Sequence, residues 1–282
     1  MRRWVVVAAA GFVLVVAAGF VLTYIPKLRR AADDLGCGNN LREIGLFAAH
    51  HVDPKKVGGD AARFPDEIPA GTIALAAAAP DDRLSWFPRV LPGLDQRRQR
   101  TEPLLTELKP LEPFAAPPNQ AVARTRLLTA LCPANVPPID ATAPAPTCYV
   151  GIAGLGADAA TLTLPDPPAA APPRAGCFRY DRPTPFAFVT DGLSQTFMFG
   201  ERSGDLGPWL RGGPATVRGL DDAPGAAPLI GTGGQFGGNH ATGANWGFAD
   251  GSVRFLTDRT DPRVLYGLAT IAGKDTDPLP GE

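Results

Sequence analysis

The first hydrophobic segment of the chain is long enough to cross a lipid bilayer. Trp4 to Ile25 contains 22 residues and no charged side chain. At a rise of about 1.5 Å per residue, a helix of this length crosses a hydrocarbon core of about 30 Å. The segment is longer than the apolar part of a typical signal peptide, and Pro26-Lys27 follows it instead of a small-residue cleavage site. We therefore predict a short tail at residues 1–3 and a retained transmembrane helix at residues 4–25. The alternatives are a cleaved signal peptide and a buried core helix.

The next segment, residues 26–52, predicts a juxtamembrane helical region. Leu28 to Ala32 continue the first helix, and the acidic and glycine residues at positions 33, 34, 36 and 38 loosen or interrupt it. A second helical run starts at Asn39-Asn40. Four of its positions recur at helical spacing, so they fall on one face. These positions are Leu41, Ile44, Ala48 and His51.

Alternating apolar residues on both sides of an Asp-Gly pair predict a β-hairpin near the C-terminus. Asp-Gly suits a type I′ turn, in which both central residues have positive φ. We expect one inward face, made by Trp246, Phe248, Val253 and Phe255 around Asp250-Gly251.

Shorter apolar runs predict the remaining elements. The predicted strands are residues 127–132, residues 147–152, and a pair at 186–189 and 196–200 around a second turn at Asp191-Gly192. Residues 99–111 and 262–271 have helical spacing, and residues 85–92 form a short buried segment. Residues 156–176 are predicted to be a surface insertion, and residues 211–220 a glycine-rich loop.

The overall composition narrows the class of protein. The 27 basic and 28 acidic side chains nearly cancel, so the chain lacks the positive field that attracts DNA or RNA. No nucleic-acid partner is expected. The 32 Gly and 31 Pro residues lie between apolar runs, which favours a loop-rich β fold over a helical bundle.

The four cysteines, Cys37, Cys132, Cys148 and Cys177, favour disulfides over a metal centre, because none forms a CxxC pair. Three connectivities are open; in one of them Cys148–Cys177 closes the insertion and Cys37–Cys132 ties the anchor helix to a strand. Small buried thiols are the alternative. An oxidising compartment places the N-terminus in the cytoplasm and the domain outside the membrane. The basic residues on the two sides of the span do not decide the orientation.

His240 and Asp250 are the first candidates for chemistry, as an acid–base or metal pair, and Asp191 and Glu201 are candidates to join them. We favour structural roles for these residues over catalytic or metal-binding ones. This interpretation gives Asp250 a role in turn geometry, His240 a structural hydrogen bond, and Glu201 a strand-end ion pair with Arg202 or Arg218. The other histidines, His50 and His51, stand on the anchor-side helix. The chain lacks the serine-hydrolase, zinc-protease and P-loop motifs, and we predict no catalytic residue, metal or cofactor.

Several segments, taken in chain order, resemble the Planctomycetes-type DUF1559 family of prepilin-like proteins with an H-X9-DG domain. His240 and Asp250-Gly251 have that spacing. The other matching segments are RRAADDLGCGNNLREIG (29–45), SWFPRVLPGLDQ (85–96), LCP (131–133), CYVGIAG (148–154), TDGLSQT (190–196) with Gly200-Glu201, and the tail from Asp261 to Thr270. Together they run from about residue 25 to residue 275.

The membrane span departs from the leader of this family. Such leaders contain the sequence Gly-Phe-Thr-Leu-Ile-Glu, and a peptidase cuts it between Gly and Phe. Glu is then the fifth residue of the mature protein. In this chain, Gly11-Phe12 and Gly19-Phe20 are followed at that position by Val16 and Tyr24. Cleavage, N-methylation and assembly into a fibre are implied by the family's leader, so this departure removes the sequence support for all three.

The resemblance implies an α+β fold, in which the transmembrane helix continues into a pilin-like helix packed on a mainly antiparallel β domain with long Pro/Gly loops. The extracytoplasmic domain would span residues 53–275, with its H-X9-DG hairpin at 240–256 and a tail at 276–282. The leading hypothesis is a structural or interaction protein without catalysis, whose partners are the bilayer and other pilin-like or cell-envelope proteins.

The second hypothesis is an anchored module that binds a solute or carbohydrate, with the ligand unknown. Trp86, Trp209 and Trp246 would stack on sugar rings, although aromatic residues at strand spacing also suit a core. An enzyme or metal protein built on His240, Asp250 and Glu201 ranks last.

Overall fold

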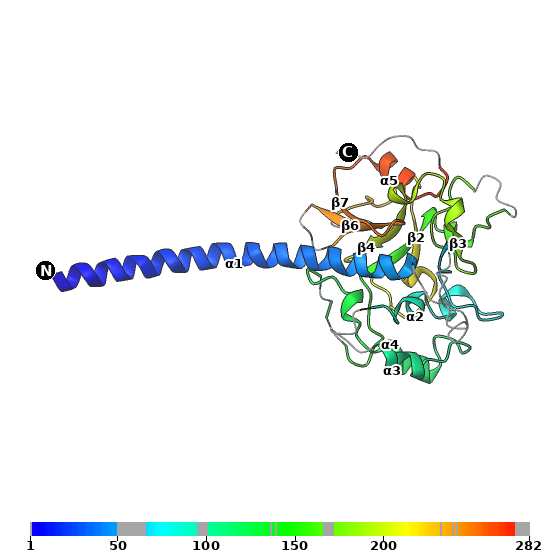
Figure 1. Ribbon diagram of the computed structural model, residues 1–282, viewed down its shortest axis with the longest axis horizontal. Helices are drawn as coiled ribbons and strands as arrows, with labels where there is room; N and C mark the ends of the chain where they lie inside the picture. The colour runs from blue at the N-terminus through cyan, green and yellow to red at the C-terminus, as the bar shows by residue number, and fades with distance from the viewer. Residues whose placement is uncertain are drawn as a thin grey trace.

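A computed structural model describes residues 2–49, 66–94, 101–135, 137–138, 140–165, 172–231, 233–238, 240 and 242–273 of the chain. One long N-terminal helix projects from a β-rich domain (Figure 1). This helix, together with a sheet whose strand pairs are mostly antiparallel, confirms the predicted α+β class.

Helix α1 (Arg2–Ala49) runs for 48 residues and carries the predicted membrane span. Its N-terminal half exposes large apolar side chains such as Val7 at 62%, Phe12 at 71% and Leu22 at 74%. Among the described residues, α1 is the one helix that is long and apolar enough to cross a membrane. The protein is therefore a single-pass, membrane-anchored chain.

The prediction that α1 is loosened or interrupted between positions 33 and 38 is wrong. The two glycines in this region lie against the domain instead of ending the helix. A Cβ on Gly36 would lie 3.0 Å from Cγ of Pro133, and one on Gly38 would lie 3.7 Å from Oδ1 of Asn245. A glycine costs a helix about 1 kcal/mol relative to alanine, and close packing of the domain offsets that cost here.

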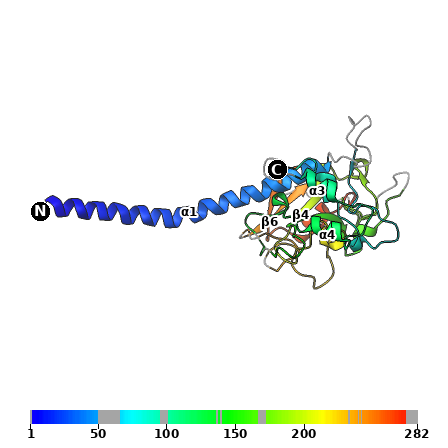
Figure 2. The ribbon, with the colours of Figure 1, turned by 90° about the horizontal axis from the view of Figure 1, so that it is seen from below.

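The C-terminal half of α1 is part of the hydrophobic core. Cys37, Leu41, Ile44 and Ala48 recur at helical spacing and are each 0% exposed. The predicted apolar face is confirmed at Leu41, Ile44 and Ala48, whereas His51 lies outside the described residues together with His50. Figure 2 shows the same helix leaving the domain without a break.

The centre of the domain is a five-stranded sheet with the order β5-β2-β4-β6-β7. Its strands are β2 (Tyr149–Leu155), β4 (Phe197–Glu201), β5 (Val217–Leu220), β6 (Gly243–Phe248) and β7 (Val253–Thr257). Only the pair formed by β2 and β5 is parallel within this sheet. A separate two-stranded sheet joins β1 (Glu67–Ile68) to β3 (Thr184–Pro185).

Different helices cover the two faces of the five-stranded sheet. On one face, Leu41 of α1 packs close to Gly247. A Cβ added to Gly247 would lie 3.3 Å from Cγ of Leu41. On the other face, α5 (Pro262–Leu268) buries Leu265 and Leu268 in a cluster with Trp246. Asp261 caps α5 by accepting a hydrogen bond from the backbone N–H of Arg263. The predicted closing helix is therefore present, although it ends before Ile271.

The predicted C-terminal hairpin is present, but two of its details differ. Gly251 has a φ of 82°, whereas Asp250 does not adopt positive φ, so the turn is not type I′. Cross-strand partners share a face, and Trp246 pairs with Arg254 whereas Asn245 pairs with Phe255.

The same register separates the four side chains that were predicted to form one inward face. Val253 and Phe255 lie on the opposite face from Trp246 and Phe248, and Phe255 is 45% exposed because β7 is the edge strand. The guanidinium of Arg254 covers the Phe248 ring at 4.7 Å. A single apolar face was therefore the wrong prediction for this hairpin.

Two further strand predictions and one loop prediction need correction. Residues 128–130 and 186–188 form the 3-10 turns η3 (Leu128–Ala130) and η5 (Phe186–Phe188) instead of strands. Residues 217–220 form β5, although they were predicted to belong to a loop. The parallel partner of β5 is β2, which lies far away in the sequence, and local periodicity does not reveal such pairing.

Short helices complete the domain beside the sheet. The predicted buried segment contains α2 (Phe87–Val90), and the predicted helix at 99–111 is reduced to α3 (Glu102–Glu107), since residues 95–100 lie outside the described part. The other short elements are α4 (Pro117–Ala123), η2 (Pro80–Asp82), η4 (Ala159–Thr161), η6 (Leu193–Gln195) and η7 (Gly213–Ala215).

Candidate functional site

His240 stands at the centre of a buried polar cluster where α1 meets the sheet. Its Nδ1 lies 2.6 Å from Oδ1 of Asp34, and its Nε2 lies 3.1 Å from Oε1 of Glu201. The His240 side chain is 1% exposed. Both ring nitrogens therefore face carboxylates, one from the helix and one from the end of β4.

Glu201 is a fully buried carboxylate, and both of its oxygens have polar partners. Oε2 accepts hydrogen bonds from the backbone N–H and the side-chain amide of Asn245, each at 3.0 Å. Oε1 faces His240. Because an unpaired buried carboxylate is strongly destabilising, the Glu201 position depends on these partners.

The Cys37–Cys132 disulfide forms one wall of the cluster, with Sγ of Cys132 3.6 Å from Nε2 of His240. It ties α1 to the segment after η3, as one of the three connectivities predicted. Two hydrogen bonds reinforce the attachment: the Asn40 amide donates to Leu131 O at 2.8 Å, and the Tyr149 hydroxyl donates to Cys37 O at 3.1 Å.

The other predicted disulfide is wrong. Cys148 and Cys177 are separate buried thiols. Sγ of Cys148 lies 3.6 Å from the carbonyl oxygen of Asn135, whereas Cys177 packs in the hydrophobic core. Burial raises the pKa of Cys148 to about 11, so this thiol stays protonated at neutral pH.

The glycine-rich approach to His240 is explained by close packing. A Cβ on Gly238 would lie 2.4 Å from Cδ2 of His240 and 3.0 Å from Cδ of Glu201. Gly237 has a φ of 156° and donates its backbone N–H to the carbonyl oxygen of Glu201 at 2.8 Å. The loop therefore passes over the pair with no space for a side chain at position 238.

The electrostatics of the cluster favour a protonated imidazole. Burial by itself lowers the pKa of His240, but the hydrogen bonds and negative charges of Glu201 and Asp34 outweigh it and raise the pKa above its usual value. A protonated ring donates one N–H to each carboxylate. In this state the imidazolium pairs with the buried Glu201 and with Asp34, whose side chain is 55% exposed, and so joins three separate segments of the chain.

The remaining predicted site residues do not join this cluster. Asp250 accepts a hydrogen bond from the backbone N–H of Ser252 at 2.8 Å, which is the turn role expected for it. Oδ2 of Asp191 accepts the N–H of Gly273 at 2.7 Å, and Gly192 has a φ of 100° in the second turn. Of the predicted candidates, only His240 and Glu201 therefore come together, whereas Asp191 and Asp250 lie in their own turns.

The predicted ion pair of Glu201 with Arg202 or Arg218 is wrong. Both arginines bind Asp205 instead, at 3.4 Å from Nη2 of Arg202 and 2.7 Å from Nη1 of Arg218. Side chains alternate along a strand, so Arg202 faces away from the cluster that Glu201 enters.

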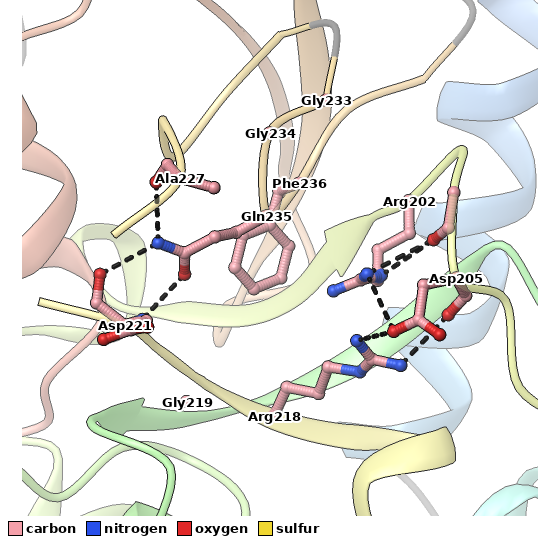
Figure 3. A pocket seen from close by; sticks show the side chains of 11 residues that line it. Arg202, Asp205, Arg218, Gly219, Asp221, Ala227, Gly233, Gly234, Gln235 and Phe236 are labelled. Atoms are coloured by element: carbon pink, nitrogen blue, oxygen red, sulfur yellow. Dashed lines mark hydrogen bonds and ion pairs between the residues drawn. The ribbon is translucent and has the colours of Figure 1, made fainter. Parts of the chain in front are cut away.

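Arg202 and Arg218 line a cleft of about 500 Å³, the volume of a small-molecule pocket. Figure 3 shows the Arg202 guanidinium between Phe236 and the Arg218–Asp205 pair, with Gln235 and Asp221 at the far end. The Arg202 guanidinium lies 6.0 Å from the centre of the Phe236 ring.

The three tryptophans proposed to stack on a ligand are core residues. Trp86, Trp209 and Trp246 are each 0% exposed. The indole N–H groups of Trp86 and Trp209 donate to Thr216 O and Thr125 O at 3.0 and 2.9 Å. A stacking surface made by these rings was therefore the wrong prediction.

Sequence reasoning missed Asp34 and Asn245 as members of the cluster. Asp34 precedes Cys37 by one helical turn, so a continuous helix would place both on one face. Treating positions 33–38 as a break concealed that signal. Asn245 alternates with Trp246 in β6, and its polar character inside a buried strand was the available indication.

The comparisons with known proteins identify one family. A family model described as "Protein of unknown function (DUF1559)" matches residues 26–227 and 221–263. No curated protein and no solved structure matches the chain. Four of the segments that carry the resemblance each supply one member of the cluster, namely Cys37, Cys132, Glu201 and His240. With a match over most of its length, the chain belongs to the DUF1559 family.

Proposed function

We propose that this protein is a structural or interaction protein of pilin-like architecture, without catalysis, whose β-rich domain is held outside the cytoplasmic membrane. The observation that carries the proposal is the dual role of α1. Its N-terminal half is apolar and exposed, and its C-terminal half is buried in the domain core. A helix with both properties fixes the domain rigidly to its membrane anchor.

The exposed apolar surface of α1 requires a nonpolar partner. The 22 residues from Trp4 to Ile25 have the length of a membrane span, and lipid covers such side chains at no cost. The helices of other pilin-like or cell-envelope proteins are the partners we propose for this segment within the bilayer.

The attachment of α1 to the domain supports a mechanical role. Leu41, Ile44 and Ala48 pack against the sheet, the Cys37–Cys132 disulfide crosslinks the helix, and Asp34 reaches His240. Three different kinds of interaction therefore fix the base of one helix. This arrangement resists rotation and withdrawal of the domain relative to its anchor.

The disulfide also supports the proposed orientation. Disulfides persist in oxidising compartments and are rare in the cytosol. The bond between Cys37 and Cys132 therefore supports our proposal that the domain lies outside the membrane and the N-terminus in the cytoplasm.

A second candidate function is binding of a small solute in the cleft beside Arg202. The specific observation in its favour is the volume of about 500 Å³ with two guanidinium groups and Phe236 at its wall. This candidate ranks second because Asp205 already binds both arginines. An enzyme built on His240 and Glu201 ranks last, since their side chains are 1% and 0% exposed and offer a substrate no access.

The orientation can be tested by labelling with a charged maleimide that does not cross the cytoplasmic membrane. Ala223 is exposed in the loop after β5, so Ala223→Cys in spheroplasts should react without permeabilisation. The wild-type chain is the matched control. Its cysteines are bonded or buried and should stay unlabelled. Labelling of the variant only after permeabilisation would reject the proposal.

A further inference from the structure

The cluster around His240 brings together four atoms of the kinds that ligate metal ions. Sγ of Cys37, Sγ of Cys132, one carboxylate oxygen of Glu201 and one ring nitrogen of His240 all lie within 4.8 Å of one another, and all four residues are buried. Two sulfurs, one imidazole nitrogen and one carboxylate oxygen suit tetrahedral coordination of Zn²⁺. The four ligands come from α1, the segment after η3, the end of β4 and the loop before β6.

The surrounding hydrogen bonds orient two of these donors in the way a metal site requires. A histidine ligand usually donates its other ring N–H to a carboxylate, and Nδ1 of His240 lies 2.6 Å from Oδ1 of Asp34. Asn245 binds Oε2 of Glu201 through two N–H groups at 3.0 Å, which leaves Oε1 directed toward Nε2 of His240. Nε2 in turn faces Sγ of Cys132 at 3.6 Å.

We propose that the Cys37–Cys132 disulfide is one of two alternative states of this cluster. In the other state both thiols are reduced, and Cys37, Cys132, His240 and Glu201 bind one zinc-type divalent cation. At a Zn–S distance of about 2.3 Å, a tetrahedral ion holds two sulfurs about 3.8 Å apart. The S–S bond must therefore break before the ion enters.

The exchange between the two states balances in atoms and electrons. A dithiol reductant gives two electrons and two protons to the sulfur pair, which breaks the S–S bond and leaves the reductant as a disulfide. The cation then displaces both thiol protons and the proton on Nε2 of His240. In reverse, a disulfide oxidant takes two electrons from the thiolates and two protons from solvent. The S–S bond re-forms, the metal leaves, and Nε2 regains a proton.

Each state gives the buried carboxylate of Glu201 a direct partner. In the disulfide state Nε2 of His240 lies 3.1 Å from Oε1 of Glu201. In the reduced state two thiolates and one carboxylate carry three negative charges, of which a divalent cation neutralises two. Both states also connect α1 to the domain at the same place. A chain that has not yet been oxidised can therefore fold around the metal, and oxidation replaces one clamp by the other.

The other two thiols provide an internal control. Cys148 and Cys177 are buried outside the donor set, and burial raises the pKa of each thiol. Removing both should leave metal binding intact, whereas removing either Cys37 or Cys132 should abolish the two-thiolate site.

The test uses the full-length protein in detergent, reduced with a phosphine and titrated with Co²⁺ under argon. We expect one Co²⁺ per chain, with thiolate-to-cobalt charge-transfer absorption and the intense visible bands of tetrahedral cobalt. X-ray absorption of the zinc-loaded protein should show two sulfur and two nitrogen or oxygen neighbours. The unreduced protein should show neither cobalt signal.

Conservative variants separate this site from general metal binding by thiols. His240→Gln and Glu201→Gln should each weaken binding at least tenfold and change the visible bands, and Asp34→Asn should weaken it about 10- to 100-fold through the orientation of His240. A Cys148→Ser/Cys177→Ala double variant should keep the full spectrum.

Three outcomes would overturn the proposal. The first is a reduced protein that is folded by circular dichroism but shows no thiolate band. The second is a spectrum that is unchanged in both His240→Gln and Glu201→Gln, because binding would then involve the sulfurs alone. The third is loss of the native circular dichroism on reduction whether or not metal is present, since the four donors meet only in the folded domain.

Discussion

Oε1 of Glu201 lies 3.1 Å from Nε2 of His240, and the two side chains are 0% and 1% exposed. Because the carboxylate has no contact with water, the imidazole is the cation that compensates its charge. The pair joins the end of β4 to the loop before β6, and the contact of His240 with Asp34 extends it to α1. The histidine of the H-X9-DG spacing thus fixes the position of the membrane anchor.

Replacing this histidine should destabilise the domain strongly. His240→Ala leaves Glu201 buried without a cationic partner, and breaking such a pair costs about 3–5 kcal/mol. Unfolding by guanidinium in detergent, followed by tryptophan fluorescence, measures the free energy of unfolding. Asp250→Ala, in the exposed turn of the same motif, should cost only about 0.5–1 kcal/mol and serves as the control. A smaller loss for His240→Ala than for Asp250→Ala would contradict this role.

The contribution of His240 should depend on pH in one direction. The pKa of His240 in the folded protein is raised, so the native state binds more protons than the unfolded chain. Its stabilisation is complete below the unfolded value of about 6.5 and is lost as pH rises through the raised native pKa. The difference in unfolding free energy between wild type and His240→Gln should therefore shrink with increasing pH. A difference that grows across this range would refute the assignment of a protonated His240.

The close approach of the loop to the cluster makes position 238 intolerant of a side chain. Gly238→Ala places a Cβ 2.4 Å from Cδ2 of His240, so the ring or the loop must move. We expect a loss of about 1–3 kcal/mol in unfolding free energy, the usual range for overpacking. Gly204→Ala is the matched control, because a Cβ there meets nothing within 4 Å. Equal effects of the two substitutions would show that position 238 has free space.

The sequence indicates the elements of this fold better than it indicates their contacts. The charge-free segment, the stripe of Leu41, Ile44 and Ala48, and the hairpin around Asp250-Gly251 depend on local periodicity, so they can be read directly. The contact between Asp34 and His240 spans 206 positions, and no local pattern specifies it. The parallel pairing of β5 with β2 escaped prediction for the same reason.

The candidate site was predictable in part. His240 stands out because it precedes the Asp-Gly turn at the spacing of the motif, and Glu201 because it stands at the end of a predicted strand. Arg202 and Arg218 offered more obvious cations for Glu201. The alternation of side chains in β4 decides between them once the strand is known. Asp250, the acid of the H-X9-DG motif, is exposed and accepts the turn hydrogen bond from Ser252.

The disulfide should account for a measurable part of the stability. Cys37 and Cys132 are 95 residues apart, and a crosslink over a loop of this size stabilises a domain by about 2–5 kcal/mol. Reduction should therefore lower the Tm of the wild-type protein when metal is chelated. It should not change the Tm of a Cys37→Ser/Cys132→Ser variant. Peptide mapping without reduction should show one Cys37–Cys132 crosslink and free thiols at Cys148 and Cys177. A crosslink between the latter two would contradict the structure.

The two faces of α1 near the domain should respond differently to the same substitution. Leu41 is 0% exposed against the sheet, whereas Leu35, less than two turns earlier on the same helix, is 71% exposed. Leu41→Ala opens a cavity and should cost about 2–5 kcal/mol in unfolding free energy, and Leu35→Ala should change it by less than about 0.5 kcal/mol. Because both substitutions are Leu→Ala in the same helix, they change the helix propensity equally, and the difference between them reports packing. Comparable losses for the two would mean that α1 is attached to the domain only through Cys37 and Asp34.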